Sequence, residues 1–259
     1  MGDLTLQDST GFCLFIANST IGREYMDGWD WKHSPMSVLM SYAYPEAIKW
    51  FVDELQPTPK PVRFMLDSGA YTAFSVGKSI SVDDYMRFIS DYGKQYGITD
   101  VVSLDVIGDA KASYENAVIM ADAGFDVIPV FHCGSELKWL HKLRERWNYI
   151  GIGRAGERRG TKLHWLYKSA FKACWPCKFH LFGCSNEPVL MEYPFYSADS
   201  SESVIASCKF GEVRSLGSQK RLGLSGATSR IAVKMDILHA LKRERKVRDY
   251  WKLRGVRYE

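Results

Sequence analysis

Short apolar segments alternate with longer segments of helical periodicity along almost the whole chain, and this alternation limits the fold more than any other feature. Apolar segments that lack polar positions are typical of strands buried on both faces in a parallel sheet. The expected strands are residues 12–17, 35–44, 62–67, 101–106, 126–132, 149–153, 178–183 and 195–199. The expected helices are residues 45–55, 81–97, 111–124, 136–147, 161–174, 187–193 and about 229–251.

The pattern therefore predicts repeated βα units, and about eight strands is the number that closes a (β/α)8 barrel. The competing fold, a doubly wound open sheet, needs a glycine-rich phosphate-binding turn after its first strand, and FCLFIANSTIG lacks one. A chain of 259 residues with 46% hydrophobic content can bury one large core. We expect an α/β chain with one domain over 1–259: a TIM-type barrel with strands over about 12–200, then a basic loop and C-terminal helix over 208–259.

Six cysteines occur in a chain that opens MGDLTLQDST, without a charged-then-apolar leader. No apolar run is long enough to span a bilayer, so we expect no membrane partner. These features predict reduced thiols in a cytoplasmic protein, or in the host cell cytoplasm if the gene is viral. Four residues have zinc-ligand side chains: Cys174, Cys177, His180 and Cys184. His180 and Cys184 share one strand face and cannot easily converge with the helix-end cysteine pair, so we expect no zinc and no other cofactor.

Aspartates stand at the ends of three predicted strands: Asp67, Asp105 and Asp199. The active site of a barrel of this type lies at the carboxyl ends of its strands. Any one of these residues could instead be a helix N-cap or a turn residue. Two aspartates that face one pocket can divide the work, with one ionised as a nucleophile and the other carrying a proton. That arrangement serves displacement at the anomeric carbon of a sugar.

Four of these segments resemble motifs of the tRNA-guanine transglycosylases. DSGAY, residues 67–71, resembles their Asp-Ser-Gly-Gly-Tyr/Phe motif, and YIGIGRAGE, residues 149–157, resembles their Gly-Gly-Leu-Ala-Val-Gly-Glu loop. VVSLDV resembles their base-recognition strand, and YSADS the strand that ends in their nucleophile. The resemblance runs through residues 12–200. It is greatest to the DNA-acting branch found in phage and bacterial genomic islands, whose members share a short barrel and an Asp-Ser-Gly-Ala variant.

The resemblance implies exchange of guanine in DNA for a 7-deazaguanine base, such as 7-cyano-7-deazaguanine, through a covalent sugar intermediate. It makes Asp199 the nucleophile and Asp67 the general acid and base. The implied base-binding residues are Asp105, Ser68, Gly69, Tyr71, His132, Gly153, Arg154, Ala155 and Gly156. From the residues alone, a tyrosine placed as Tyr71 is more often a core residue, and His132 could equally be a hydrogen-bonded core histidine.

The chain departs from the tRNA enzymes after its nucleophile candidate. Those enzymes carry a zinc site there, built from closely spaced cysteines and a histidine, and this chain has only Cys208 beyond Asp199. The departure removes part of the case for tRNA as the substrate. DNA and a free 7-deazaguanine base are therefore the expected partners. An accessory protein or a homodimer is left open.

Basic residues near the expected mouth are candidates for holding the phosphate backbone, because a base in a duplex must leave the stack to reach a pocket. They are Arg158, Arg159, Arg214, Lys220 and Arg221. The net charge is only +4, and the basic residues are concentrated toward the C-terminus. KRERKVRDYWKLR in the last helix could grip DNA or simply cover the barrel.

Three functions from different classes stay open. The first is base exchange in DNA. The second is the same chemistry on tRNA, or hydrolysis of a small glycoside by Asp67 and Asp199. The third is a non-catalytic nucleic-acid-binding barrel subunit.

Overall fold

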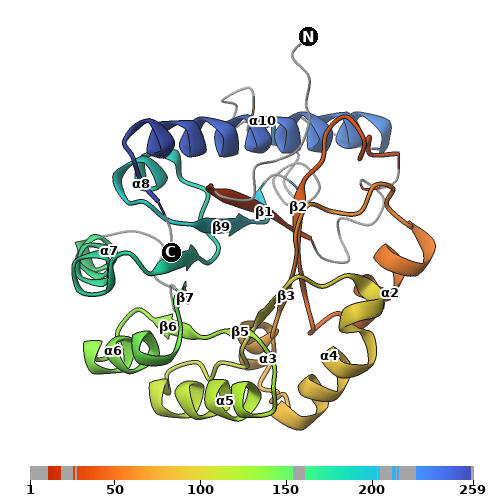
Figure 1. The fold of residues 1–259 in the computed structure, drawn as a ribbon. Helices are drawn as coiled ribbons and strands as arrows, with labels where there is room; N and C mark the ends of the chain where they lie inside the picture. The colour runs from red at the N-terminus through yellow and green to blue at the C-terminus, as the bar shows by residue number, and fades with distance from the viewer. Residues whose placement is uncertain are drawn as a thin grey trace.

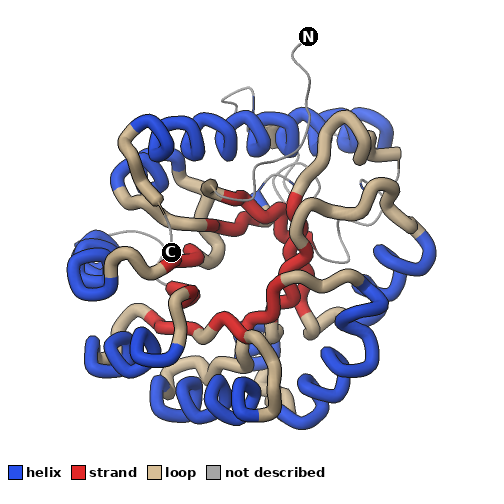
Figure 2. The backbone as a smooth tube through the Cα atoms, viewed as in Figure 1, coloured by secondary structure: helices blue, strands red, loops and turns tan. Residues whose placement is uncertain are grey.

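The computed structural model describes residues 11–18, 26, 28–153, 161–202, 204, 212–213, 215 and 226–257. Its strands form a ring that is surrounded by helices (Figures 1 and 2). All the pairings are parallel, in the order β5-β4-β3-β2-β1-β9-β8-β7-β6. The strands are β1 (Cys13–Asn18), β2 (Ser37–Ser41), β3 (Phe64–Asp67), β4 (Asp100–Val102), β5 (Val127–Ile128), β6 (Val130–His132), β7 (Tyr149–Gly153), β8 (Lys178–Leu181) and β9 (Ser197–Ser200). The predicted α/β TIM-type barrel is confirmed.

The fifth predicted strand is divided in two, which gives nine strands in a barrel of eight strand positions. β5 pairs with β4 and β6 pairs with β7, and Pro129 lies between them. Proline has no backbone N–H and cannot continue a ladder on that side. Its carbonyl still accepts a hydrogen bond from the backbone N–H of Gly151 at 2.8 Å. The two ends of the sheet are therefore joined through one residue, and the barrel is nearly closed.

Helices cover the outside of the barrel and follow the expected segments closely. They are α2 (Pro45–Lys49) with the π-helical turn η2 (Trp50–Glu54), α3 (Ala70–Ser75), α4 (Val82–Tyr96), α5 (Ala110–Asp122), α6 (Leu137–Arg146), α7 (Thr161–Cys174), α8 (Glu187–Glu192) and α10 (Gly226–Leu253). Ser81 caps α4 by accepting the backbone N–H of Asp84 at 3.4 Å. The short helix α3 lies where only a loop was expected.

Each strand is buried on both faces, which explains its continuous apolar sequence. Leu14 and Ile16 point outward into the core shared with the helices, whereas Phe15, between them, points into the barrel. Met65 and Val102 fill the barrel interior beside Phe15. Because side chains alternate along a strand, the next residue of β3 after Met65 that points into the barrel is Asp67, at the carboxyl end of the strand.

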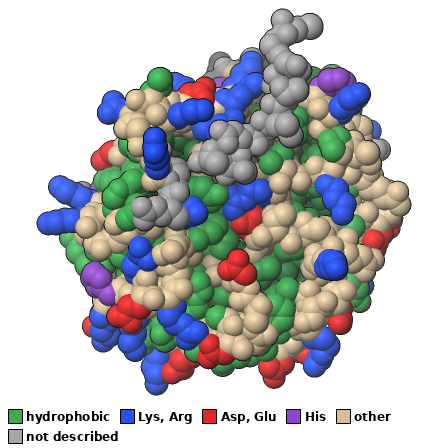
Figure 3. Space-filling model, viewed as in Figure 1, with side chains coloured by type: hydrophobic (Ala, Val, Ile, Leu, Met, Phe, Trp, Pro, Cys, Tyr) green, Lys and Arg blue, Asp and Glu red, His purple; other side chains and the backbone are tan. Residues whose placement is uncertain are grey.

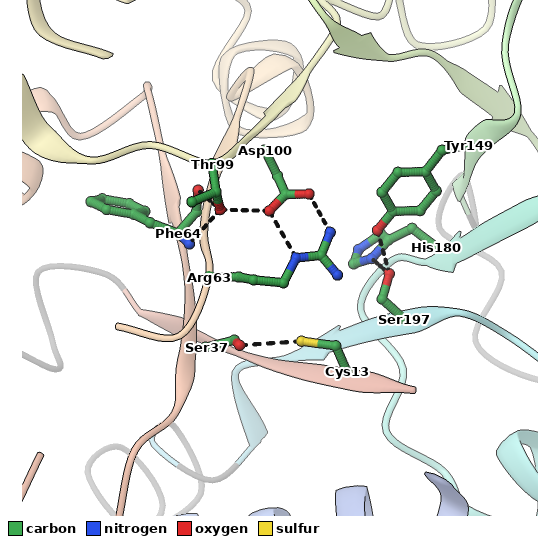
Figure 4. Close-up of polar contacts among 9 residues, drawn as sticks. All are labelled: Cys13, Ser37, Arg63, Phe64, Thr99, Asp100, Tyr149, His180 and Ser197. Carbon is green, nitrogen blue, oxygen red and sulfur yellow. Dashed lines mark hydrogen bonds and ion pairs between the residues drawn. The ribbon is translucent and has the colours of Figure 1, made fainter. Parts of the chain in front are cut away.

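A polar cluster closes the amino-terminal end of the barrel (Figure 4). Nε of Arg63 donates to Oδ2 of Asp100 at 3.0 Å, and the terminal guanidinium nitrogen pairs with Oδ1. The guanidinium also lies 5.1 Å from the ring centroid of Phe15 and 5.3 Å from that of Tyr196. Contacts at the amino-terminal end of such a barrel contribute to stability, because the active site of this fold lies at the opposite end.

The long helix α10 covers β1 and α8 along one side of the barrel (Figure 1). Oε2 of its buried Glu244 accepts the backbone N–H of Leu14 at 3.1 Å, and burial raises the pKa of Glu244 to about 7. Trp251 donates from Nε1 to the carbonyl of Leu190 at 2.8 Å. The C-terminal helix therefore packs on the barrel as one of its two interpretations predicted. Within the described residues, no helix is both long and apolar enough to cross a bilayer.

Candidate active site at the carboxyl ends of the strands

The Asp-Ser-Gly segment forms the turn between β3 and α3. Gly69 has a φ of 79°, and a Cβ there would lie 2.7 Å from the backbone nitrogen of Ala43, so only glycine fits. Its backbone N–H donates to Oδ2 of Asp67 at 3.0 Å. The turn therefore holds the Asp67 carboxylate at the barrel mouth, and its tight packing explains why glycine follows the aspartate so closely.

Asp67 is the most perturbed carboxyl group of the mouth. Its pKa is raised to about 7, chiefly because burial disfavours the charged form, and next because of the charge of Asp105. The charge of Asp199 raises it further, while hydrogen bonds from Ser41 and Gly69 oppose the rise. A carboxyl group with this pKa can both give and take a proton near neutrality, as general acid and base catalysis requires.

Asp105 is held from two sides by buried side chains. The Ser68 hydroxyl donates to Oδ1 at 2.9 Å, and His132 lies with Nε2 2.7 Å from Oδ2. The strand was expected to run to residue 106, but β4 ends at Val102, so Asp105 lies in the loop that follows. A carboxylate with one such bond on each oxygen keeps lone pairs for a ligand, because the group has about four acceptor positions.

His132 stands behind Asp105, at the end of β6. Its Nδ1 is buried and has no hydrogen-bond partner among the residues described here. A Cβ at Gly153 would lie 2.4 Å from this Nδ1, so the imidazole occupies the space next to the glycine. Glycine at the end of β7 therefore makes room for the ring that orients Asp105.

Asp199, at the inward-facing third position of β9, is 7% exposed. Both of its hydrogen bonds are made by Oδ1, from Nε2 of His180 at 3.2 Å and from the backbone N–H of Gly183 at 2.8 Å. Oδ2 has no hydrogen-bond partner within the described part of the chain. The carboxylate is thus anchored by one oxygen, and the other is available for a ligand.

The three aspartates lie at the carboxyl ends of β3 and β9 and in the loop that follows β4. The charges of Asp105 and Asp199 both raise the pKa of Asp67, and Asp105 is hydrogen-bonded to Ser68, the residue next to Asp67. Neighbouring negative charges favour protonation of the carboxyl group whose anion is least stabilised, and here that group is Asp67. The arrangement can therefore supply one proton carrier and two hydrogen-bond-stabilised carboxylates.

The other expected base contacts are distributed differently. Tyr71 lies on α3 and is 61% exposed, which excludes the core interpretation for this residue. Gly153 ends β7 beside His132. Eight expected residues lie outside the described residues: Arg154, Ala155, Gly156, Arg158, Arg159, Arg214, Lys220 and Arg221.

Basic side chains in the described part of the surface do not gather in one patch on the face drawn in Figure 3. Lys and Arg are scattered over this face, toward its middle as well as around its edge, with Asp and Glu among them. In α10, Lys246 pairs with Glu187 and Arg248 pairs with Glu244. These two cations are already engaged within the chain, although exposed pairs such as Lys246 with Glu187 hold weakly in water.

The four residues with zinc-ligand side chains do not converge. His180 points into the barrel toward Ser197 and Asp199, whereas Cys174, Cys177 and Cys184 belong to the core between strands and helices. Among the described residues, no group of three or more His, Cys, Asp or Glu side chains could hold a metal ion. Sequence reasoning missed the place of His180 beside Asp199. The usable signal was strand alternation: Phe179 and Leu181, on either side of His180, face the helices, so His180 faces the barrel interior.

Comparisons with known proteins support the fold alone. No family model and no curated protein matches the chain. Among solved structures, it is similar to a mutant tryptophan synthase alpha-subunit from Pyrococcus furiosus, at 12% identity and a TM-score of 0.51, over 92% of this chain and 100% of that chain. A structure of the tryptophan synthase a2b2 complex from the same organism gives 11% identity and a TM-score of 0.52 over the same shares. The resemblance to the tRNA-guanine transglycosylases stays a prediction from the sequence.

Proposed function

We propose that the protein is a DNA guanine transglycosylase that exchanges guanine for a 7-deazaguanine base. The observation that carries the proposal is the pairing of Asp67 and Asp199 in one mouth with different surroundings. Asp67 has a pKa of about 7 and can carry a proton, while Oδ1 of Asp199 is held by two N–H donors and Oδ2 has no hydrogen-bond partner among the described residues. This is the division of roles that displacement at an anomeric carbon needs.

In the first half of the proposed reaction, Oδ2 of Asp199 attacks C1′ of a deoxyguanosine. The bond from oxygen to C1′ forms as the bond from C1′ to N9 breaks, and its electron pair leaves with the base. Guanine takes the proton of Asp67 and departs neutral. Proton donation matters because guanine is a poor leaving group as an anion, and a positioned acid contributes about 100- to 10,000-fold to such a step.

In the second half, the Asp67 carboxylate removes the N9 proton of the incoming 7-deazaguanine. N9 then attacks C1′, and the bond from C1′ to Asp199 breaks. The Asp199 carboxylate and the protonated Asp67 are restored, so the cycle consumes no other reactant. One bond to C1′ replaces another in each half, which explains why exchange needs no external energy source.

Asp105 is the proposed recognition group for the purine. A carboxylate that accepts from Ser68 and His132 can accept further N–H groups from the edge of a guanine. A site built around buried polar groups rejects a base that leaves those groups unpaired. The exposed ring of Tyr71 is proposed to stack on nucleic-acid bases at the rim, since base stacking on an aromatic ring contributes about 1–3 kcal/mol.

The test is incubation of the purified protein with radiolabelled 7-cyano-7-deazaguanine and, separately, duplex DNA, single-stranded DNA or tRNA. We expect label in DNA with wild-type protein and none with Asp199→Asn. Label only in tRNA would assign the same chemistry to RNA. Release of guanine without incorporation would assign a hydrolase, and binding without release or incorporation would assign a non-catalytic subunit.

A further inference from the structure

A series of hydrogen bonds runs from Tyr149, whose ring lies beside Arg63 of the amino-terminal cluster, through Ser197 to His180 (Figure 4), and from His180 on to Asp199. The Tyr149 hydroxyl lies 2.5 Å from Oγ of Ser197, and that oxygen lies 2.7 Å from Nδ1 of His180. Nε2 of His180 lies 3.2 Å from Oδ1 of Asp199. Ser197 and His180 are completely buried, so water does not compete for these bonds.

The direction of the bonds follows from counting donors and acceptors. The carboxylate of Asp199 only accepts, so Nε2 of His180 must carry a hydrogen. If Nδ1 accepts from the Ser197 hydroxyl, that hydroxyl in turn accepts from Tyr149, and every hydrogen has a partner. If Nδ1 donated as well, the ring would be charged, and the hydroxyl hydrogen of either Ser197 or Tyr149 would have no acceptor among the described residues. The series therefore favours the neutral ring with its hydrogen on Nε2.

The imidazole cannot easily turn away from this arrangement. Its ring makes edge contacts with Phe15 at 5.9 Å and with Phe182 at 4.4 Å between ring centroids. The large ring of Phe182 fits in the barrel because residue 151 is glycine, where a Cβ would lie 2.3 Å from the Phe182 ring. Packing and hydrogen bonds therefore define the same position for the His180 ring.

Oδ1 of Asp199 receives two N–H groups, from His180 and from the backbone of Gly183. Two donors on one oxygen fix the plane of the carboxylate as well as its position. The opposite oxygen, Oδ2, is left unbonded within the described residues. A nucleophile held in this way loses little orientational freedom when it attacks, which is a recognised source of rate enhancement.

We infer that His180 is the positioning residue of the nucleophile: with Ser197 and Tyr149 fixing its tautomer, it anchors Oδ1 of Asp199 and directs Oδ2 at the anomeric carbon of a bound nucleoside. The inference rests on the proposed function, in which Asp199 is the attacking group. His180 itself touches neither the base nor the sugar in this scheme. It acts by orienting Asp199, at the end of the series Tyr149, Ser197, His180, Asp199.

Base-exchange kinetics provide the first test. His180→Phe keeps an aromatic ring for Phe15 and Phe182 to pack against and removes both nitrogens. We expect kcat to fall on the order of 100-fold, with the KM values for DNA and base changed less than about twofold, because orientation of the attacking group is lost and ligand contacts are not. His180→Gln places an amide N–H near the position of Nε2 and should recover at least part of the loss. Equal kcat values for His180→Phe and wild type would overturn the inference.

Ser197 allows a smaller change, and a second buried serine, Ser103, provides a matched control. Ser197→Ala removes only the partner of Nδ1, so kcat should fall less than in His180→Phe. Ser103→Ala deletes another fully buried serine hydroxyl of the barrel, one without a hydrogen-bond partner among the described residues, and should leave kcat unchanged. Circular dichroism and thermal melting show whether each variant folds. An equal loss in both serine variants would assign the effect to general disturbance of the barrel and contradict the role of the series.

The tautomer is measured without any substrate. In ¹⁵N-labelled protein, the two ring nitrogens of His180 should show the tautomer that carries its hydrogen on Nε2 and leaves Nδ1 as the acceptor. Ser197→Ala should shift the Nδ1 signal most. A ring protonated on Nδ1 would overturn the inference.

The two claims fail in different ways. If wild-type protein exchanges base and Asp199→Asn does not, while His180→Phe is fully active, the proposed function stands and the positioning role is wrong. If wild-type protein exchanges no base in any polymer, the proposed function fails and the role of His180 in that reaction fails with it. The nitrogen signals then still decide whether the hydrogen-bond series exists.

Discussion

Nε2 of His132 lies 2.7 Å from Oδ2 of Asp105, and the same imidazole fills the space that a side chain at position 153 would need. Gly153→Ala should therefore push the ring away from Asp105, since the new Cβ would stand 2.4 Å from Nδ1. We expect weaker binding of the base, seen as a KM for free 7-deazaguanine that rises at least about tenfold, the equivalent of 1.4 kcal/mol.

A glycine on α4 supplies the control for that change. At Gly93 an added Cβ would meet only Ile89, at 3.5 Å, which is ordinary contact. Gly93→Ala should leave the KM unchanged and stabilise the helix by up to about 1 kcal/mol. Unchanged base binding in Gly153→Ala would show that His132 does not orient Asp105.

The pH dependence of guanine release should report Asp67. The proposed acid must be protonated when guanine leaves, and its pKa is about 7. The rate of covalent-intermediate formation should hence be level below pH 7 and fall about tenfold per unit above it. Single-turnover measurements of guanine release across this range provide the check. A rate that rises through the same range would assign the proton transfer to another group.

The same raised pKa predicts an effect on stability. A carboxyl group with a folded pKa above its unfolded pKa contributes fully at pH values below the unfolded pKa, and that contribution is lost as pH rises through the folded pKa. For Asp67 the window runs from 3.8 to about 7. Asp67→Asn carries no charge at any pH, so it should melt at a higher temperature than wild type at about pH 8 and near the wild-type temperature at about pH 4.

Glu244 also has a raised pKa, with burial as the largest cause, but it lies on α10 and contacts β1, outside the barrel. Glu244→Gln should also flatten the dependence of melting temperature on pH, and it should leave base exchange unaffected. Melting curves of both variants between about pH 4 and 8 separate the two contributions. Parallel melting curves for wild type and Asp67→Asn would mean that the pKa of Asp67 is not raised in the folded protein.

The amino-terminal cluster should matter for stability and not for chemistry. Arg63→Met leaves the buried carboxylate of Asp100 with Thr99 as its one side-chain hydrogen-bond partner among the described residues, and the loss of one partner of a buried ion pair costs about 3–5 kcal/mol. Urea unfolding should register that loss, while kcat of the folded fraction stays at the wild-type value. Replacing Asp100 by Asn in the same chain should restore part of the stability, and a failure to do so would show that the pair is not the source.

Most of the fold could be predicted from the sequence because strands buried on two faces leave a distinctive apolar pattern. The division at Pro129 was also visible in principle, since proline cannot donate to a neighbouring strand. The early end of β4, at Val102, could not be predicted from the sequence. There the loop backbone finds partners on α5 instead of a strand: Asn116 donates to the carbonyl of Leu104, and Ser113 accepts from the backbone of Val106. Such side-chain partners follow from tertiary contacts that periodicity does not contain.

The site was predictable as a set of strand-end carboxyl groups but not as a network. Parallel strands bring Asp67 and Asp199 to the same end of any barrel, so their shared mouth follows from topology. The partners of each carboxylate depend on register across strands. His180 pairs in register with Ser197, and this places the imidazole beside Asp199 two residues further along β9. The sequence shows the histidine but not the strand it will face.

The most direct test of the central claim is to find the residue that becomes bonded to the sugar. Wild-type protein is incubated with a guanine-containing DNA duplex in the absence of incoming base, denatured, digested with protease and examined by mass spectrometry. The account predicts a deoxyribose-linked peptide modified at Asp199, which disappears in Asp199→Asn and on addition of a 7-deazaguanine before denaturation. A sugar attached to Asp67 or Asp105 instead, or guanine released with no attached peptide, would contradict it.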